Sequence, residues 1–180
     1  MTELVNAVAG GELGTQLDLI SIAERDDLYQ VQYEPEVAPN LCFRLIKDGP
    51  TIILYRSGAF SIAGADSIEE IESAFNQLTE FIENLDLRPD ADYEIRYLVF
   101  KSNFGREIDL SELHKHLGSD AAEYEPEQFP QLKYDASEYG GVFMISRTGS
   151  IIYTGDTSTK KAKRAIDEVS NKIQTLFQGK

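Results

Sequence analysis

The chain has 180 residues and a formal net charge of −14, because 17 lysines and arginines stand against 31 aspartates and glutamates. Lys and Arg supply most of the affinity for phosphate, so this balance argues against a general polyanion binder and against a protein that lies on anionic lipid. Hydrophobic residues make up 42% of the chain, which is enough to build a core and excludes a disordered acidic tail.

The first elements in chain order are a short strand and a short helix. The strand is predicted over residues 4–10 and the helix over residues 18–26. Asp18 fits the N-cap of that helix, since its carboxylate can accept a free backbone N–H. The phrase Tyr33-Glu34-Pro35-Glu36 then predicts a turn, because Pro35 fixes φ and ends any helix before it.

Three strands and a longer helix complete the first half. The strands are predicted near residues 40–46, 51–55 and 59–63, and Gly64 is predicted to end the sheet. A capping box at Ser67 opens the helix. Its apolar residues follow at helical spacing: Ile68, Ile71, Phe75, Leu78 and Ile82.

A repeat runs through the chain at a fixed offset of 91 residues. The phrase Tyr33-Glu34-Pro35-Glu36 returns as Tyr124-Glu125-Pro126-Glu127. Further identities in this register are Gly14 with Gly105, Asp18 with Asp109, Pro39 with Pro130, Leu41 with Leu132, Gly49 with Gly140, Arg56 with Arg147, Gly58 with Gly149, Gly64 with Gly155 and Ser67 with Ser158. Two copies do not make a solenoid. They predict two similar halves, 1–90 and 91–180, around a pseudo-two-fold axis.

The second half predicts the same elements in the same order. A strand over residues 93–101 precedes a helix over residues 109–117, which Asp109 caps. Three strands follow, near residues 131–134, 142–146 and 150–154. The last helix starts at Ser158 and carries Ala162, Ala165, Ile166, Val169, Ile173 and Phe177. Runs of adjacent strands with separate helices predict an α+β fold with an antiparallel sheet.

The residues offer no catalytic or metal-binding constellation. Cys42 is the single cysteine, which excludes an internal disulfide and a multi-cysteine metal site. His114 and His116 are two apart and point about 200° apart on a helix, so they cannot share a metal. Neither a phosphate loop nor a Ser–His–Asp arrangement is present. We therefore expect no enzyme activity, no cofactor and no small-molecule substrate.

The chain carries no sign of a membrane or export signal. The residues after Met1 lack the basic segment and apolar run of a signal peptide. No stretch approaches the roughly 18 apolar residues that span a bilayer. We expect a cytoplasmic protein with no membrane contact, and its acidic composition suits a high-salt cytoplasm.

The duplicated order resembles the TATA-box-binding protein family in its archaeal form. The resemblance is carried by Tyr124-Glu125-Pro126-Glu127-Gln128-Phe129-Pro130 and by Ser57-Gly58 followed by Ala63-Gly64-Ala65. It covers nearly the whole chain. It implies a saddle, a duplicated curved antiparallel sheet with four helices on its convex face. The concave face would bind A·T-rich promoter DNA in the minor groove, where aromatic wedges kink the duplex, and the protein would recruit transcription factor B.

The resemblance also implies which residues face DNA: Asn6, Val8, Arg44, Tyr55, Tyr97, Val99, Phe129 and Thr154. Several family positions are altered. The four wedge aromatics fall on Ala38 and Tyr55 in the first half and on Phe129 and Ser146 in the second. The phosphate-binding lysines fall on Ala59, Asp66, Ser150 and Thr157. The arginine kept at Arg44 becomes Asp135 in the second half.

These departures leave two functions open. The loss of about five cationic contacts removes much of the salt-dependent affinity for DNA, and Ala or Ser cannot replace a Phe wedge. The chain is therefore either a general transcription factor of this type or a degenerate paralogue that acts as a protein-interaction or regulatory module. Phe129 also fits a loop aromatic that closes a hairpin, and Tyr55 a cross-strand packing residue. Asn6 also fits a residue bonded to neighbouring backbone.

Two surface features point to partners. The resemblance assigns Glu125, Glu127 and Gln128 to a loop that binds transcription factor B, although these residues also fit solvated turn charges. The cluster Lys160, Lys161, Lys163 and Arg164 opens the last helix. It fits a solvated helix face, and otherwise a grip for nucleic acid or a regulator.

Overall fold

The computed structural model describes residues 2–155 and 157–177 as two compact units. The first unit is Val5–Arg96, and the second unit combines Met1–Leu4 with Tyr97–Lys180. The division falls within the first strand of each repeat, so each of these strands contributes residues to both units.

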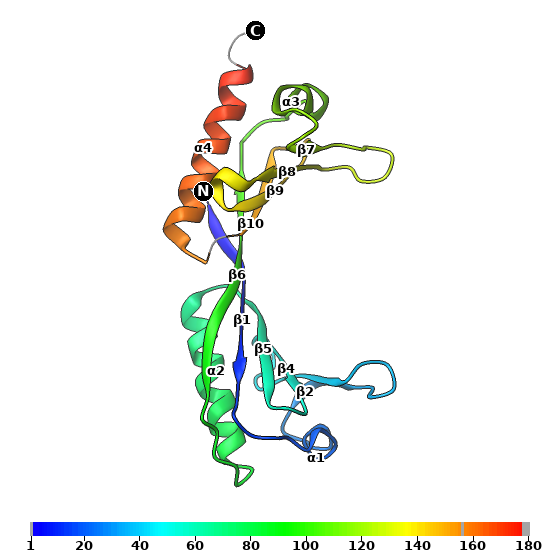
Figure 1. Cartoon of the computed structure of the whole chain (residues 1–180), viewed down its shortest axis with the longest axis vertical. Coiled ribbons are helices and arrows are strands. Elements are labelled where there is room, and N and C mark those ends of the chain that lie inside the picture. Colours follow the sequence, from blue (N-terminus) through cyan, green and yellow to red (C-terminus); the bar gives the residue numbers. More distant parts are fainter. Residues whose placement is uncertain (1, 156, 178–180) are drawn as a thin grey trace. The chain divides into compact units, whose positions relative to one another are not determined.

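The first unit is an antiparallel sheet with a long helix against one face (Figure 1). Phe43 and Phe60 lie on that face and pack on Phe81 and Phe75 of the helix, with ring centroids 5.8 and 5.9 Å apart. The strands lie in the order β2-β3-β4-β5-β1. The elements are β1 (Glu3–Glu12), α1 (Leu19–Ala23), β2 (Tyr29–Tyr33), β3 (Asn40–Arg44), β4 (Thr51–Tyr55), β5 (Ala59–Ala65) and α2 (Ile68–Glu83).

The second unit repeats this plan with the strand order β6-β10-β9-β8-β7 (Figure 1). Its core joins the aromatic rings of Phe143 and Tyr153, 4.8 Å apart, to the buried alanines and aliphatic residues of the last helix. The elements are β6 (Asp92–Asn103), α3 (Leu110–Leu117), β7 (Ala122–Glu123), β8 (Leu132–Ala136), a 3-10 turn at Ser137–Tyr139, β9 (Gly141–Ile145), β10 (Ser150–Gly155) and α4 (Thr159–Phe177).

In each sheet, the side chains that alternate with the buried ones form a second face. In β4, Ile52 and Leu54 are buried, whereas Thr51 and Ile53 are half-buried and Tyr55 is exposed. The same alternation runs through β3, β5, β8, β9 and β10. We call this second, accessible side of each unit its open face.

The α+β class and the four helices of the described residues agree with the sequence prediction, and some details do not. The helix predicted over residues 18–26 ends at Ala23, and the strand predicted over residues 40–46 ends at Arg44. Strands β2 and β7 were missed, because β2 lies at the sheet edge with little burial and β7 has only two residues. The prediction that Gly64 ends the sheet was wrong. Strand β5 continues to Ala65, and Gly64 lies at an irregularity with a φ of +89° that favours glycine.

The start of α2 shows how a local signal fixes an element. The Ser67 hydroxyl accepts a hydrogen bond from the Glu70 N–H at 3.2 Å. The Glu70 carboxylate accepts one from the Asp66 N–H at 2.9 Å, one residue earlier than in a standard capping box. Two otherwise free backbone donors are thereby satisfied.

Removing this cap is expected to destabilise the fold measurably. Ser67→Ala should lower the free energy of unfolding by about 1 kcal/mol, as is typical for loss of an N-cap hydroxyl. Urea unfolding followed by circular dichroism measures the change. Ser73→Ala within the same helix is the matched control and should be close to neutral. Equal effects of the two substitutions would contradict a capping role for Ser67.

Candidate nucleic-acid interface

The open face of the first unit is built from small and apolar side chains. Val8 lies opposite Ala63 in the antiparallel register, and Ala63 lies opposite Thr51. The Asn6 side-chain oxygen accepts a hydrogen bond from the Gly64 N–H at 3.0 Å. This bond fixes the amide and leaves its two N–H donors without a partner among the described residues.

The open face of the second unit has the same design at the repeat-related positions. Val99 lies opposite Thr154, and Thr154 lies opposite Val142 on its other side. Ile152 and Met144 form the next pair along the same face. Tyr97, which stands where the first half has Asn6, is exposed. At these positions each unit therefore presents mainly small and apolar side chains.

The sequence analysis missed a cation on the first unit's open face, Arg96. Burial along β6 does not alternate regularly, since Arg96 and Tyr97 are both exposed. A Cβ atom placed on Gly10 would lie 3.1 Å from Arg96 Nε, so the guanidinium covers Gly10 on the same side as Val8. Arg96 also pairs with Glu94. Arg96 reaches this face because the alternation of β6 is irregular. A prediction that assumes strict alternation along the strand would place Arg96 on the other face.

Two lysines on the second unit's open face were also missed. Lys101 lies opposite Ile152, two residues after Val99, and is exposed. Lys133 lies opposite Met144 and pairs with Glu123 at 3.3 Å. Their place on the face follows from strand alternation, which the sequence could have supplied. Cations are therefore present on this side, although the positions of the family lysines, such as Ala59 and Ser150, carry none.

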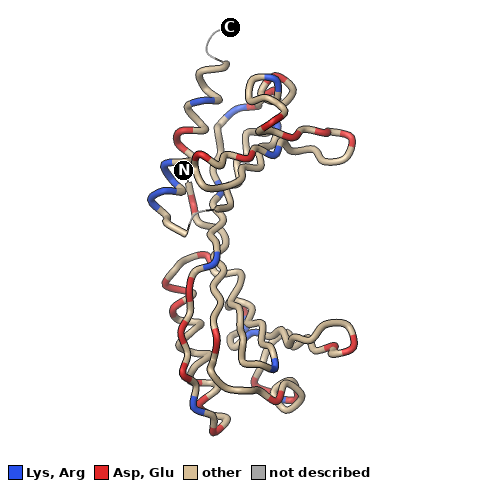
Figure 2. Tube along the Cα trace, viewed as in Figure 1, with Lys and Arg blue, Asp and Glu red and all other residues tan. Residues whose placement is uncertain are grey.

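Arg44 and Asp135 occupy equivalent open-face positions with opposite charge. Arg44 ends β3 and lies opposite Tyr29 of the edge strand, and its buried Nε atom has no hydrogen-bond partner within residues 2–155 and 157–177. Asp135 lies opposite Val142 and is exposed. Most acidic residues lie elsewhere. Figure 2 shows them along α2 and in two protruding loops, residues 34–39 between β2 and β3 and residues 124–131 between β7 and β8. Lysines and arginines gather at the start of α4.

The candidate wedge residues are accessible, one in each unit. Tyr55 ends β4 opposite Asn40 and is 39% exposed. Phe129 lies in the loop between β7 and β8 and is 45% exposed. Ala38 and Ser146 occupy the repeat-related positions and offer no ring. The two aromatic side chains therefore stand at different places in the two repeats.

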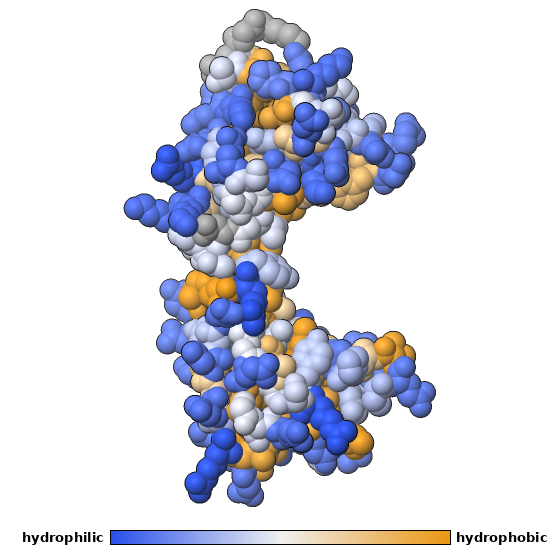
Figure 3. All heavy atoms as spheres, viewed as in Figure 1, coloured by the Kyte–Doolittle hydropathy of each residue, from blue (hydrophilic) through white to orange (hydrophobic). Residues whose placement is uncertain are grey.

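The two protruding loops share one backbone design. The N–H groups of Ala38 and Phe129 donate to the carbonyl oxygens of Glu34 and Glu125, at 2.9 and 2.8 Å. In the second loop Glu125, Glu127 and Gln128 are all exposed. In the first loop Val37 takes the place of Gln128 and is 81% exposed, and Figure 3 shows an apolar patch at the end of this loop. The loops thus differ in polarity at their tips.

Two other side chains that were considered have structural surroundings. A ring nitrogen of His114 lies 2.9 Å from the Ala122 carbonyl oxygen, which joins α3 to β7. Cys42 is half-buried on the open face, where the Asn40 amide donates to its sulfur. In residues 2–155 and 157–177, no group of three His, Cys, Asp or Glu residues could hold a metal ion. Over the same residues, no helix is long and apolar enough to span a membrane.

Fold and surface together define a duplicated α+β protein that presents an apolar sheet face and a protruding loop in each repeat. A family model described as "Transcription factor TFIID (or TATA-binding protein, TBP)" matches residues 1–85 and again residues 92–176. The chain belongs to this family of general transcription factors, which are not enzymes.

Relatives and a solved structure agree with the family match. The chain is 32% identical to TATA-box-binding protein 2 of Haloferax volcanii over 97% of its own length and 94% of that protein. It is 33% identical to the TATA-box-binding protein of Pyrobaculum aerophilum, over 95% and 85% of the two chains. The structure of Methanococcus jannaschii TBP superimposes with a TM-score of 0.81 at 30% identity, covering 97% of this chain and 98% of that one.

Proposed function

We propose that the chain binds A·T-rich promoter DNA in the minor groove through its open faces and recruits transcription factor B for transcription initiation. The observation that carries the proposal is the matched pair of apolar faces, with Val8 and Ala63 in one repeat and Val99 and Thr154 in the other. An apolar sheet can lie on A·T pairs, because only guanine places an amino group in the minor groove.

The polar groups of these faces suit that groove. A·T pairs present only acceptors there, adenine N3 and thymine O2. The amide donors of Asn6 can meet such acceptors, since the side-chain oxygen is already bonded to Gly64. The Thr154 hydroxyl can donate in the same way in the second repeat. Tyr97, at the position equivalent to Asn6, is exposed and would present its ring to the groove.

Tyr55 and Phe129 are proposed as the wedges that unstack base steps. Both are accessible aromatic side chains. Inserted apolar side chains kink a duplex, and the extra contact with bent DNA offsets the energy of unstacking. With one aromatic in each repeat, we expect a smaller bend than four wedges would give.

Cations next to the apolar faces are proposed to hold phosphates. Arg44, Arg96 and Lys101 take this role in place of the family lysines, whose positions carry Ala59, Asp66, Ser150 and Thr157 here. Contacts of this kind add affinity that falls as salt rises. At about 1 M salt the Debye length is roughly 3 Å, so a salt-adapted protein gains little from more of them.

Lys101 provides a direct test of this placement. Lys101→Ala should reduce the slope of log K against log salt by about 1, as expected for the loss of one phosphate contact. Fluorescence anisotropy on a labelled A·T-rich duplex across salt concentrations measures the slope. Lys115→Ala, which removes an exposed lysine of α3, should leave it unchanged. An unaltered slope in Lys101→Ala would remove Lys101 from the interface.

The second protruding loop is proposed as the contact for transcription factor B. Glu125, Glu127 and Gln128 are exposed. The backbone of this loop forms a turn in which the Gln128 and Phe129 N–H groups donate to the Glu125 carbonyl oxygen. Carboxylates on an accessible, preformed loop suit a partner with basic residues, because charge complementarity steers association.

A second function is supported by Ala38, Ser146 and Asp135. These residues remove two wedges and place a negative charge on the open face. A paralogue that keeps the partner loop but binds DNA weakly would compete for transcription factor B and act as a regulatory module. Either function would place the chain in the cytoplasm, at the nucleoid when DNA is bound.

One titration separates the two functions. The chain is titrated against an A·T-rich and a G·C-rich duplex, with and without transcription factor B, from low to high salt. The proposal predicts a complex on the A·T-rich duplex that transcription factor B strengthens. A complex with transcription factor B alone would favour the regulatory module. No complex with either would contradict both functions.

A further inference from the structure

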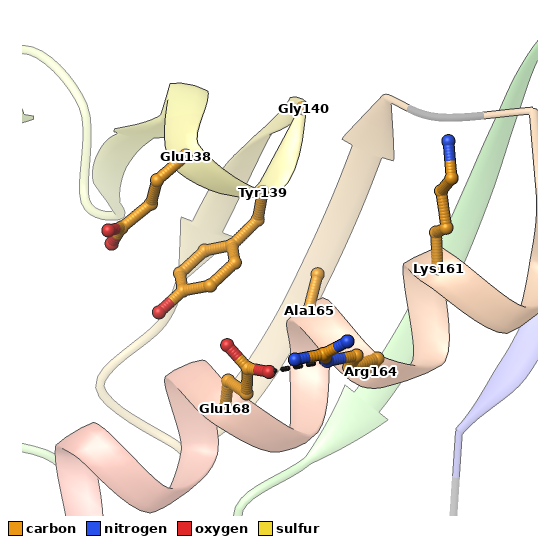
Figure 4. Close-up of a pocket in the computed structure, with 7 residues that line it drawn as sticks. All are labelled: Glu138, Tyr139, Gly140, Lys161, Arg164, Ala165 and Glu168. Atoms are coloured by element: carbon orange, nitrogen blue, oxygen red, sulfur yellow. Dashed lines mark hydrogen bonds and ion pairs between the residues drawn. The ribbon is translucent and has the colours of Figure 1, made fainter.

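The strongest unexplained feature of the molecule is a cavity of about 480 Å³ in the second unit, between the 3-10 turn and α4. Figure 4 shows Tyr139 pointing from the turn toward α4, where Lys161 and Arg164 lie on the other side. It belongs neither to the open face nor to the partner loop, since α4 packs on the opposite side of the sheet through buried residues such as Ala165 and Ile166.

The repeat provides a reference for this cavity. The equivalent site in the first unit has a volume of only about 30 Å³. Four of its lining residues, Glu70, Ser73, Ala74 and Gln77, lie 91 positions before four residues that line the large cavity: Lys161, Arg164, Ala165 and Glu168. The two sites are therefore copies of one position in the fold that have diverged.

The two copies differ in the residues that face the helix. Leu45 and Ile46 line the small site, and a Cβ on Gly49 would meet the Ile46 side chain. Their counterparts in the second repeat, Ala136 and Ser137, are smaller and do not line the large cavity. Its wall opposite α4 is formed by Glu138, Tyr139 and Gly140.

The charge of the helix rim is reversed between the two copies. Glu69, Glu70 and Glu72 of α2 correspond to Lys160, Lys161 and Lys163 of α4, and Ser73 corresponds to Arg164. The cationic rim is exposed on a chain whose net charge is −14. A change of sign at three equivalent positions, together with an opened cavity, favours a ligand with negative charge.

The carboxylates of the cavity wall are already paired. Glu168 accepts from Arg164 Nε at 2.7 Å, and Glu138 lies 3.3 Å from Lys172 Nζ. The Arg164 side chain is 81% exposed, so the rest of its guanidinium edge faces solvent. Tyr139 and Ala165 add apolar wall between the charges.

We propose that this site, which we call the α4 cavity, docks an acidic segment of a partner protein. A peptide can place separate carboxylates at Lys161 and Arg164, which line the cavity, and an apolar side chain against Tyr139. A nucleic-acid backbone fits less well, because its continuous charge would also meet Glu138 and Glu168 on the wall. Since the α4 cavity and the open face lie on opposite sides of the second sheet, the acidic segment and DNA can be bound together.

The test is a selection of peptides from a random display library on the full chain, followed by anisotropy titration of the selected peptides. We expect sequences rich in Asp and Glu around one apolar residue. Lys161→Glu with Arg164→Glu reverses the rim at the two cations that line the cavity. This double variant should weaken binding at least about tenfold. Lys47→Glu with Arg88→Glu makes the same charge change in the first unit and should have no effect.

If the α4 cavity holds something other than an acidic segment, the same experiments give results that overturn the proposal. Selected peptides without acidic residues, or equal binding to the rim reversal and its control, would exclude an acidic docking segment. Displacement of the peptide by a G·C-rich duplex would assign the cavity to nucleic acid. A dimer in sedimentation that the rim reversal abolishes would assign it to a second copy of the chain. Phe129→Ala should leave peptide binding intact, so a failure here is distinct from a failure of DNA binding.

Discussion

Phe129→Ala is expected to weaken binding to an A·T-rich duplex by roughly 5- to 150-fold. The range corresponds to about 1–3 kcal/mol, the loss usually measured when an aromatic side chain that stacks on a base is removed. Phe129 is held in place by the hydrogen bond from its N–H to the Glu125 carbonyl oxygen and is 45% exposed. It therefore needs no rearrangement of the loop to reach a base step.

The duplication offers both a control and a reverse experiment for Phe129. Val37→Ala shortens an exposed apolar side chain of the equivalent first loop and should change DNA affinity little. Ala38→Phe places a ring at the position equivalent to Phe129 and should strengthen binding and increase the bend. Anisotropy and energy transfer between labelled duplex ends measure the two quantities. Wild-type affinity and bend in Phe129→Ala would contradict the wedge assignment.

Glu125→Lys combined with Glu127→Lys is expected to abolish the complex with transcription factor B on promoter DNA. Reversing two exposed charges at a contact replaces attraction with repulsion, and we expect a loss of at least about 100-fold in affinity. Binding to DNA alone should be retained, because neither carboxylate lies on the open face. A band-shift titration with transcription factor B at fixed promoter concentration measures the effect.

The matched control for the partner loop is the same change in the first repeat. Glu34→Lys with Glu36→Lys alters an identical phrase with the same turn, in which the Ala38 N–H donates to the Glu34 carbonyl oxygen. Assembly should persist in this variant. If both double variants lose the complex equally, the contact depends on general charge and not on the second loop.

Much of the fold could be predicted from local patterns and from the repeat. Ile71, Leu78 and Ile82 recur at helical spacing and are buried in α2, as predicted. The edge strand β2 was missed although Tyr-Gln-Val-Gln-Tyr alternates, because it directly precedes the turn at Pro35 and buries little apolar surface. An edge strand depends on pairing with its neighbour, which a single segment does not encode.

The candidate interface was predictable in its apolar part and less so in its charges. Val8, Val99 and Thr154 were assigned to this side by the family resemblance, and they lie on the open faces. Arg96 reaches the face only through the irregular alternation of β6. The α4 cavity depends on how Glu138, Tyr139 and Gly140 lie against α4 and on no motif. The position of Arg96 and the presence of the cavity depend on how separate elements pack together. The pattern of residues along the sequence does not encode that packing.

The net charge of −14 is compatible with binding DNA because of where the charges lie. Many of the acids lie along α2 and in the protruding loops (Figure 2), and on the open faces Arg44, Arg96, Lys101 and Lys133 stand against Glu12, Glu123 and Asp135, with Glu94 paired to Arg96. Overall charge governs solubility and long-range attraction, whereas the groove meets only the residues of the face.

Minor-groove readout through the open faces is tested most directly by exchanging A·T pairs for I·C pairs in the bound duplex. Inosine lacks the guanine amino group, so the minor groove stays close to that of A·T while the major-groove pattern changes. We predict nearly equal affinity for the A·T and I·C duplexes and much weaker binding to the G·C duplex. Loss of binding on the I·C duplex, with binding retained on A·T, would contradict the account.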